Sequence, residues 1–127
     1  MRAIGSTIDA VFRSSDSKSE ATLVRGMGAS PGVYEGVARR VDSPVDFDRL
    51  ERGDVLVTAS TNASFSVVLP MLGAMVTDSG GVLSHAAIVS RESGIPGVVG
   101  CQDATTLISD GARVRVDGST GQVEVIA

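Results

Sequence analysis

Short apolar runs, separated by glycine and other turn-forming residues, dominate the chain from Thr22 onward and predict a series of strands. Two of these runs, residues 55–58 and 74–77, are almost wholly apolar, which is typical of strands buried on both faces. A turn at Ser30-Pro31-Gly32 lies between the run at residues 23–24 and the run at residues 33–41. The strands expected in this part of the chain cover residues 23–24, 33–41, 55–58, 74–77 and 98–99.

The C-terminal region alternates valine with arginine and predicts a hairpin. Val114 and Val116 alternate with arginines, a turn is expected at residues 117–121, and a second strand at residues 123–126. This alternation indicates that one face of the hairpin lies in solvent.

Helical spacing is clearest in residues 84–93, where we expect a helix that ends at Gly94, with Pro96 just beyond it. Residues 64–72 favour a weaker helix, and residues 46–50 a single helical turn. Strands outnumber helices and are interspersed with them. The fold class is therefore mixed α/β, in one compact set of layers.

The first 21 residues have a different pattern. Four apolar residues are spaced like one face of a short helix, and residues 13–20 contain no apolar residue, which is typical of a flexible linker. We therefore divide the chain into a short N-terminal helix with a flexible linker, residues 1–21, and one domain, residues 22–127. The expected helix face consists of Ile4, Ile8, Val11 and Phe12.

Composition and charge argue against several classes of protein. A formal net charge of -4 argues against a nucleic-acid partner, which needs a basic face to neutralise phosphates. No apolar run reaches the roughly 18 residues of a membrane span, and residues 1–20 lack the apolar stretch of a secretory signal. The single cysteine, Cys101, cannot form an internal disulfide and is expected to be a small buried residue. We therefore expect a cytoplasmic protein.

His85 is the only histidine of the chain, and it lies at the start of the helix predicted for residues 84–93. A helix start leaves backbone N–H groups without partners and carries partial positive charge, so it suits a phosphoryl dianion. The same charge disfavours a protonated imidazole and keeps the ring neutral and nucleophilic near pH 7. A covalently phosphorylated histidine needs this arrangement.

Four neighbours could support such a site. Gly80 and Gly81 would let the preceding loop come close to the ring and offer N–H donors. Ser84 could cap the helix or donate to phosphate, and Arg91 could reach back toward the loop or pair with a carboxylate of a partner.

From these residues alone, other roles for His85 stay open. A single histidine is more often a surface residue or a satisfied core residue. One histidine and one cysteine cannot supply a zinc site, so no metal ligands are expected. The chain contains no P-loop. The physical argument ends at a helix start that suits phosphate and contains a histidine.

Four stretches resemble the phosphohistidine domain of the phosphoenolpyruvate-utilising enzymes, which include phosphoenolpyruvate synthase, pyruvate phosphate dikinase and rifampin phosphotransferase. The core is "VTDSGGVLSHAAIVSRESGIPGVVG", residues 76–100. "GMGASPGVYEGVA" (residues 26–38) and "GDVLV" (residues 53–57) are similar to the opening of that domain. "DGARVRVDGSTGQVEV" (residues 110–125) is similar to its closing hairpin.

The resemblance implies a swivelling β/β/α phosphohistidine domain in which His85 is the phosphorylated residue, with Gly80, Gly81 and Ser84 shaping its pocket. It also implies that the domain shuttles a phosphoryl group between two partners. These are a nucleotide-grasp (ATP-binding) domain and a barrel for pyruvate or phosphoenolpyruvate. No cofactor is expected on this chain, while Mg²⁺ and ATP or phosphoenolpyruvate are expected at the partner domains.

The chain departs from the family at three positions. Leu83 stands where the family often has a threonine that is a regulatory site in some members, and Ala63 and Phe65 stand where proline and tryptophan are common. The leading hypothesis is a phosphoryl-carrier domain that is inactive alone. A binding or regulatory module that keeps the fold is the alternative. A dehydratase subunit of similar fold would not need the histidine motif.

Overall fold

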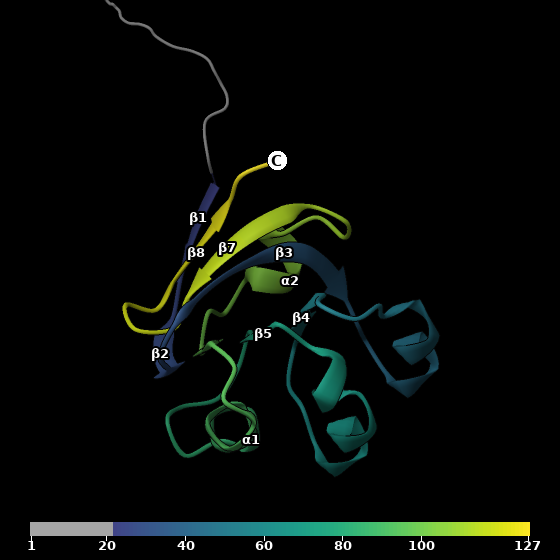
Figure 1. The fold of residues 1–127 in the computed structure, drawn as a ribbon. Coiled ribbons are helices and arrows are strands. Elements are labelled where there is room, and N and C mark those ends of the chain that lie inside the picture. The colour runs from purple at the N-terminus through teal and green to yellow at the C-terminus, as the bar shows by residue number, and fades with distance from the viewer. Residues whose placement is uncertain (1–21) are drawn as a thin grey trace, which may run out of the picture.

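The computed structural model describes residues 22–127, so the predicted N-terminal helix and linker lie outside the described residues. The chain folds into strands, two α-helices and several short 3₁₀ helices (Figure 1). The strands are β1 (Thr22–Arg25), β2 (Met27–Ser30), β3 (Val33–Arg40), β4 (Val55–Thr58), β5 (Ala74–Thr77), β6 (Gly97–Val99), β7 (Arg113–Asp117) and β8 (Gln122–Val125). The helices are η2 (Pro44–Arg49), η3 (Ala63–Val67), η4 (Leu69–Met71), α1 (His85–Ser93) and α2 (Ala104–Leu107).

The strands follow the order β1-β8-β7-β3-β4-β5-β6-β2 and form two sheets that share β3. The first part of β3, residues 33–37, pairs antiparallel with β7, and its last part, residues 38–40, pairs parallel with β4. β4, β5 and β6 are parallel to one another, and β2 closes the edge antiparallel to β6. The long curved β3 is therefore the junction of an antiparallel sheet and a mainly parallel one (Figure 1).

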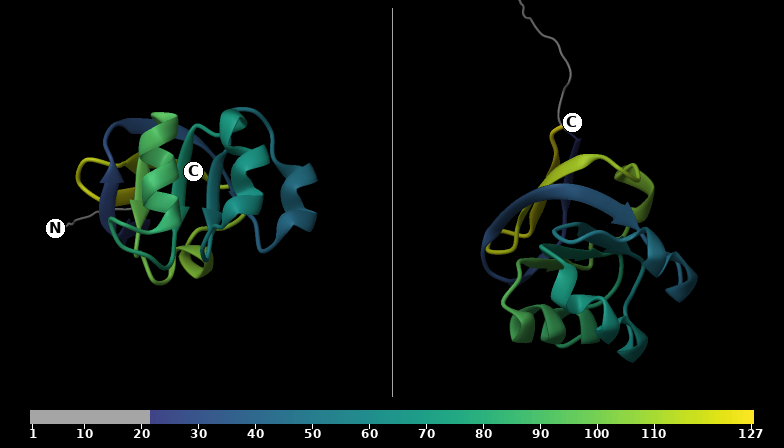
Figure 2. Two further views of the ribbon diagram at one scale, coloured as in Figure 1. Left: turned by 90° about the horizontal axis from the view of Figure 1, so that it is seen from below. Right: turned by 45° about the vertical axis from the view of Figure 1, so that its right-hand side comes forward.

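Two apolar clusters, one on each face of the parallel sheet, define three layers. Val55 and Val57 of β4 pack into a cluster with Val114 and Val116 of the antiparallel sheet. Leu56 of the same strand points the other way, into the cluster beneath α1. α1 and the 3₁₀ helices lie next to one another across the parallel strands in the view from below (Figure 2). The β/β/α arrangement is thus confirmed.

The sequence pattern predicted the buried strands correctly. All four residues of β4 and all four of β5 are buried, because the antiparallel sheet covers one face and helices cover the other. The C-terminal hairpin has the expected solvent face: Val114 and Val116 are buried, while Arg113 and Arg115 are exposed.

Three elements differ from the sequence-based expectation. The helix expected at residues 64–72 is two 3₁₀ helices that meet at Val68, and Pro70 lies at the start of the second. β2 and α2 were not predicted. β2 crosses the β7–β8 turn so closely that a Cβ on Gly118 would lie 1.8 Å from the carbonyl oxygen of Ser30. A side chain at this position would prevent the crossing.

Candidate functional site

His85 is the first residue of α1 and lies at the carboxyl ends of the parallel strands. The loops that follow β4 and β5 meet here, because parallel neighbours end at the same edge of a sheet. The backbone N–H groups of Asp78 and Ser79 donate to the carbonyl oxygens of Thr58 and Ala59, at 3.1 and 3.0 Å. The hydroxyl of Ser79 also donates to the carbonyl of Ala59 at 2.9 Å. The two loops are thereby tied into one surface around a half-buried imidazole.

Thr61 is a site residue that the sequence analysis missed. Its Oγ1 lies 2.8 Å from Nδ1 of His85, and the two residues are 24 positions apart in the chain. The only sequence signal for this contact is that Thr61 closely follows a buried strand. That signal becomes informative only once β4 and β5 are known to be parallel neighbours.

The start of α1 leaves backbone donors beside the histidine. Ser84 is the N-cap, and its hydroxyl oxygen accepts from the N–H of Ala87 at 3.3 Å. The first intrahelical bond runs from the N–H of Ile88 to the carbonyl of Ser84 at 3.0 Å. The N–H groups of His85 and Ala86 therefore have no partner within the helix. They lie in the first turn, where the helix dipole favours an anion.

The two glycines before the helix differ in conformation. Gly80 has φ of 103°, and a Cβ there would lie 2.8 Å from both Cβ and Oγ of Ser84. Gly81 is not among the residues with positive φ, and a Cβ there would have no atom within 4 Å. The backbone at Gly80 therefore requires glycine, whereas the backbone at Gly81 has room for a side chain.

Arg91 holds the loop in place. Its guanidinium donates to the carbonyl oxygen of Val82 at 2.7 Å and to that of Ala29, in β2, at 2.9 Å. The side chain therefore reaches back as the sequence suggested, but both of these bonds go to backbone carbonyls. This geometry indicates that Arg91 positions the loop before His85.

Asp78, the last charged residue before His85 in the chain, is also bonded within the domain. Its carboxylate accepts from the N–H of Thr105 at 3.0 Å and from the Thr105 hydroxyl, both at the start of α2. Cys101 follows β6 nearby and is buried. Burial, followed by the charge of Asp78, raises the pKa of the Cys101 thiol to about 12. Cys101 is therefore a neutral packing residue, as expected.

Within residues 22–127, no group of three or more histidine, cysteine, aspartate or glutamate side chains could hold a metal ion.

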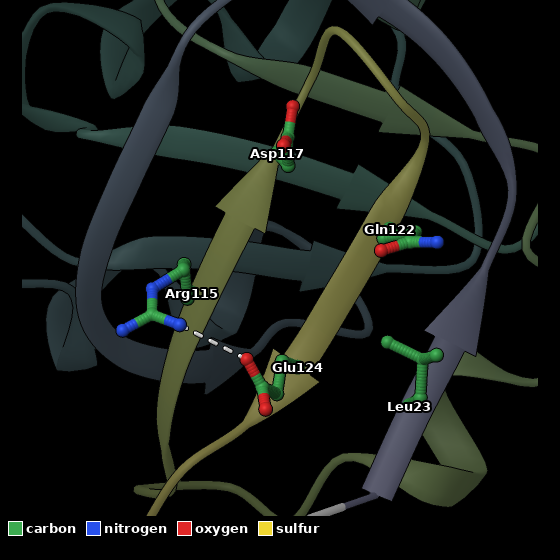
Figure 3. Close-up of a pocket in the computed structure, with 5 residues that line it drawn as sticks. All are labelled: Leu23, Arg115, Asp117, Gln122 and Glu124. Atoms are coloured by element: carbon green, nitrogen blue, oxygen red, sulfur yellow. Dashed lines mark hydrogen bonds and ion pairs between the residues drawn. The ribbon is translucent and has the colours of Figure 1, made fainter.

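A shallow pocket of about 210 Å³ lies on the antiparallel sheet and is lined by residues of β1, β7 and β8 (Figure 3). Its cation, Arg115, is paired with Glu35 at 2.7 Å and with Glu124 at 3.1 Å. Because Asp117 and Glu124 also line it, this pocket does not suit a phosphate.

A family model for the mobile domain of PEP-utilising enzymes matches residues 50–121, more than half of the chain. The chain belongs to this family. Its relatives include the phosphoenolpyruvate synthase of Aeropyrum pernix, which is 51% identical over 104 residues, or 80% of this chain and 12% of that protein. The rifampicin phosphotransferase of Bacillus subtilis (strain 168) is 42% identical over 105 residues, or 83% of this chain and 12% of that protein.

A solved structure to which this chain is similar is the solution structure of the Enzyme I protein nEIt. It is 36% identical with a TM-score of 0.53, and the match covers 60% of this chain and 32% of that one. This mobile-domain chain spans only about one eighth of the length of its curated relatives, so most of each relative consists of other parts. Among the residues described, no helix is both long and apolar enough to cross a membrane.

Proposed function

We propose that this chain carries a phosphoryl group on Nε2 of His85 and passes it between a donor site and an acceptor site on partner domains. The observation that carries the proposal is the contact between Nδ1 of His85 and Thr61 at the start of α1. When Nδ1 keeps its proton and donates it to the threonine oxygen, the lone pair of the neutral ring is on Nε2. Nε2 is then the nitrogen that attacks phosphorus.

In the loading step, the lone pair of Nε2 forms a bond to phosphorus while the bond between phosphorus and the leaving oxygen of the donor breaks. The electron pair of that bond stays on the leaving oxygen. The ring retains its Nδ1 proton and becomes cationic, and the hydrogen bond to Thr61 stabilises it in this state. Transfer to the acceptor reverses these bond changes and regenerates the neutral ring.

The surroundings of His85 suit the phosphoryl group that the ring would carry. The N–H groups of His85 and Ala86 offer donors at the positive end of the helix dipole. The hydroxyl of Ser84 accepts from Ala87 and keeps its own proton for donation. The positive φ of Gly80 turns the preceding loop toward this helix start. Phosphoryl transfer depends mainly on such positioning and charge stabilisation.

In this proposal, partner domains supply the metal ion and the phosphoryl donor. The described residues offer no metal-binding cluster, and the sequence has no P-loop. We therefore assign Mg²⁺, together with ATP or phosphoenolpyruvate, to a nucleotide-grasp domain and to a pyruvate or phosphoenolpyruvate barrel. The much greater length of the relatives, which leaves room for such domains, supports this assignment.

The test is loading of the intact chain by two donors. Phosphoramidate is a small chemical donor that needs no docking, and the full-length Bacillus subtilis relative with Mg²⁺ and ATP or phosphoenolpyruvate is a protein donor. Intact mass spectrometry should show one added phosphoryl group on the wild type and none on His85→Ala. Circular dichroism of the variant checks that it remains folded.

The bond type separates the proposal from its alternatives. A phosphohistidine is lost in acid and survives base, unlike a phosphoserine ester, and ¹⁵N NMR shows which ring nitrogen carries phosphorus. Label that persists in His85→Ala would exclude His85 as the carrier. A folded wild type that neither donor loads would favour a binding or regulatory module instead.

A further inference from the structure

The segment that contains both Thr61 and His85, residues 55–90, is almost free of charge and is followed directly by Arg91. Although 20% of the whole chain is charged, Asp78 is the only aspartate, glutamate, lysine or arginine in residues 55–90. The carboxylate of Asp78 is bonded to the backbone and hydroxyl of Thr105. The charged residues lie instead in the flanking segments, where they form ion pairs such as Arg39–Asp54 and Arg115–Glu35.

Apolar side chains are exposed in the same region, next to His85. The side chain of Leu83 is 82% exposed and that of Val82 is 47% exposed, both in the loop before the helix. Ile88, one turn after His85, is 40% exposed. These three residues flank His85 along the chain, in the loop and the first turn of α1, and we call them the apolar rim.

A local structural role does not account for Leu83. It stands at the position before the N-cap, and Ile88 stands at the fourth position of the helix. In many proteins these two positions pack together and fix the direction in which the chain enters the helix. Here Leu83 remains largely in solvent, and the loop is held by Arg91 instead. A single exposed apolar side chain is common on protein surfaces, whereas several grouped beside one site mark an interaction surface.

Charge complementarity indicates what covers it. A phosphoryl dianion on His85 needs cationic partners during transfer. Residues 55–90 contain neither lysine nor arginine, and the guanidinium of Arg91 is bonded to the carbonyl oxygens of Val82 and Ala29. The covering surface must therefore bring the positive charge in its centre. Around that centre it must be uncharged, because a charged group opposite the apolar rim would lose its water without gaining a partner.

We propose that the apolar rim of Val82, Leu83 and Ile88 is a docking surface for a phosphate-binding protein domain with an apolar rim and a cationic centre. The proposal rests on the function proposed above and identifies the chemistry of the partner surface. Docking excludes water from His85, which strengthens the charge interactions at the reacting phosphorus. Because the rim itself is uncharged, the approach of the partner is not steered by ion pairs at the rim.

The experiment compares loading by the two donors in variants of the intact chain. Leu83→Ser should lower the rate constant for loading by the full-length Bacillus subtilis relative by roughly tenfold, which corresponds to the loss of one buried leucine contact. Loading by phosphoramidate should stay at the wild-type rate, because a small donor does not dock. Leu107→Ser is the matched control, since Leu107 is 48% exposed but lies on α2, and both of its rates should equal those of the wild type.

Salt provides a second measurement. The rate constant for loading by the relative should change less than about threefold when NaCl is raised from about 0.05 to about 0.5 M, since contacts of uncharged groups are not screened. A steep fall with salt would overturn the uncharged docking surface, as would an unchanged protein-driven rate in Leu83→Ser.

The remaining outcomes separate the two proposals. Loading of the wild type by phosphoramidate but not by the relative would overturn the docking proposal and leave the chemistry of His85 standing. No loading by either donor would overturn both. A dimer of this chain that Leu83→Ser dissociates would assign the apolar rim to a second copy, and the docking proposal would then be wrong.

Discussion

At the scale of single residues, the chemistry of the site depends on which nitrogen of His85 faces Thr61. The contact of 2.8 Å between Oγ1 and Nδ1 gives the two ring nitrogens different environments. It holds the ring in one orientation at the start of α1. A histidine without such a partner can rotate and exchange tautomers, and it then presents Nε2 in the attacking form for only part of the time.

Replacing Thr61 with valine tests this role with little change in shape. We expect Thr61→Val to slow loading by phosphoramidate roughly two- to tenfold, since a hydrogen bond contributes about 0.5–1.5 kcal/mol. The ¹⁵N NMR shifts of the ring should show an altered tautomer ratio, and Thr61→Ser should restore both readouts. Thr106→Val, an exposed change on α2, is the control. Wild-type rate and shifts in Thr61→Val would show that the contact has no role in the chemistry.

Cys101 predicts a pH dependence of stability. Burial raises its pKa from 9.0 to about 12, so above pH 9 the unfolded chain loses the thiol proton while the folded chain keeps it. Stability must therefore fall as pH rises through this range, by roughly 1.4 kcal/mol per pH unit for this group. Urea unfolding at about pH 8 and about pH 10.5 should show a shallower fall for Cys101→Ala than for the wild type. Equal slopes for the two proteins would contradict the assignment.

At the scale of elements, the loop between β5 and α1 and the helix start form one unit. Ser84 caps the helix, Gly80 turns the loop against Ser84, and Arg91 ties the loop back to its own helix. The loop therefore keeps its shape through contacts with α1, and the site depends on the position of both.

The two glycines of this loop should respond differently to the same substitution. Gly80→Ala forces a side chain into a backbone with φ of 103° and against Ser84, so we expect a loss of about 1–3 kcal/mol in the free energy of unfolding together with slower loading. Gly81→Ala has open space and should stay within about 0.5 kcal/mol of the wild type. Urea unfolding and phosphoramidate loading measure both effects. Equal losses in the two variants would mean that the loop geometry is not the cause.

Elements with strong local signals were predicted well, and α2, which has none, was not. The helix at residues 84–93 has an N-cap serine and a terminal glycine, and the structure has α1 with Ser84 as N-cap and Gly94 at φ of 72°. α2 has four residues and starts where Asp78, 27 positions earlier, bonds to Thr105. A helix of one turn cannot stabilise itself, so its formation depends on a distant contact that no local pattern contains.

At the scale of the whole molecule, three layers support the histidine site. The parallel sheet is covered on both faces and holds α1 rigidly against β2, β5 and β6. The pocket on the antiparallel sheet is lined by residues of β1, β7 and β8 and has its cation paired. This pocket therefore does not suit a phosphoryl donor.

We accordingly expect that the isolated chain does not phosphorylate itself. Purified protein mixed with Mg²⁺ and either ATP or phosphoenolpyruvate should keep its unmodified mass, because nothing positions or activates the donor phosphorus. Adding the full-length Bacillus subtilis relative should produce the phosphorylated mass, and omission of either donor is the control. Rapid loading without any partner would reveal a donor site within this chain and would contradict the carrier assignment.

The sequence by itself determined most of the strands, the helix α1 and the position of His85 at its start, because each follows from local periodicity and capping. It also determined the family, since the four motifs stand in order along one domain. Only the tertiary structure decided that Thr61 meets His85, that Arg91 bonds to Ala29, 62 positions away, and that β3 joins two sheets. These contacts depend on which strands become neighbours. That choice is made by burial of both faces of the parallel sheet, which is a property of the whole fold.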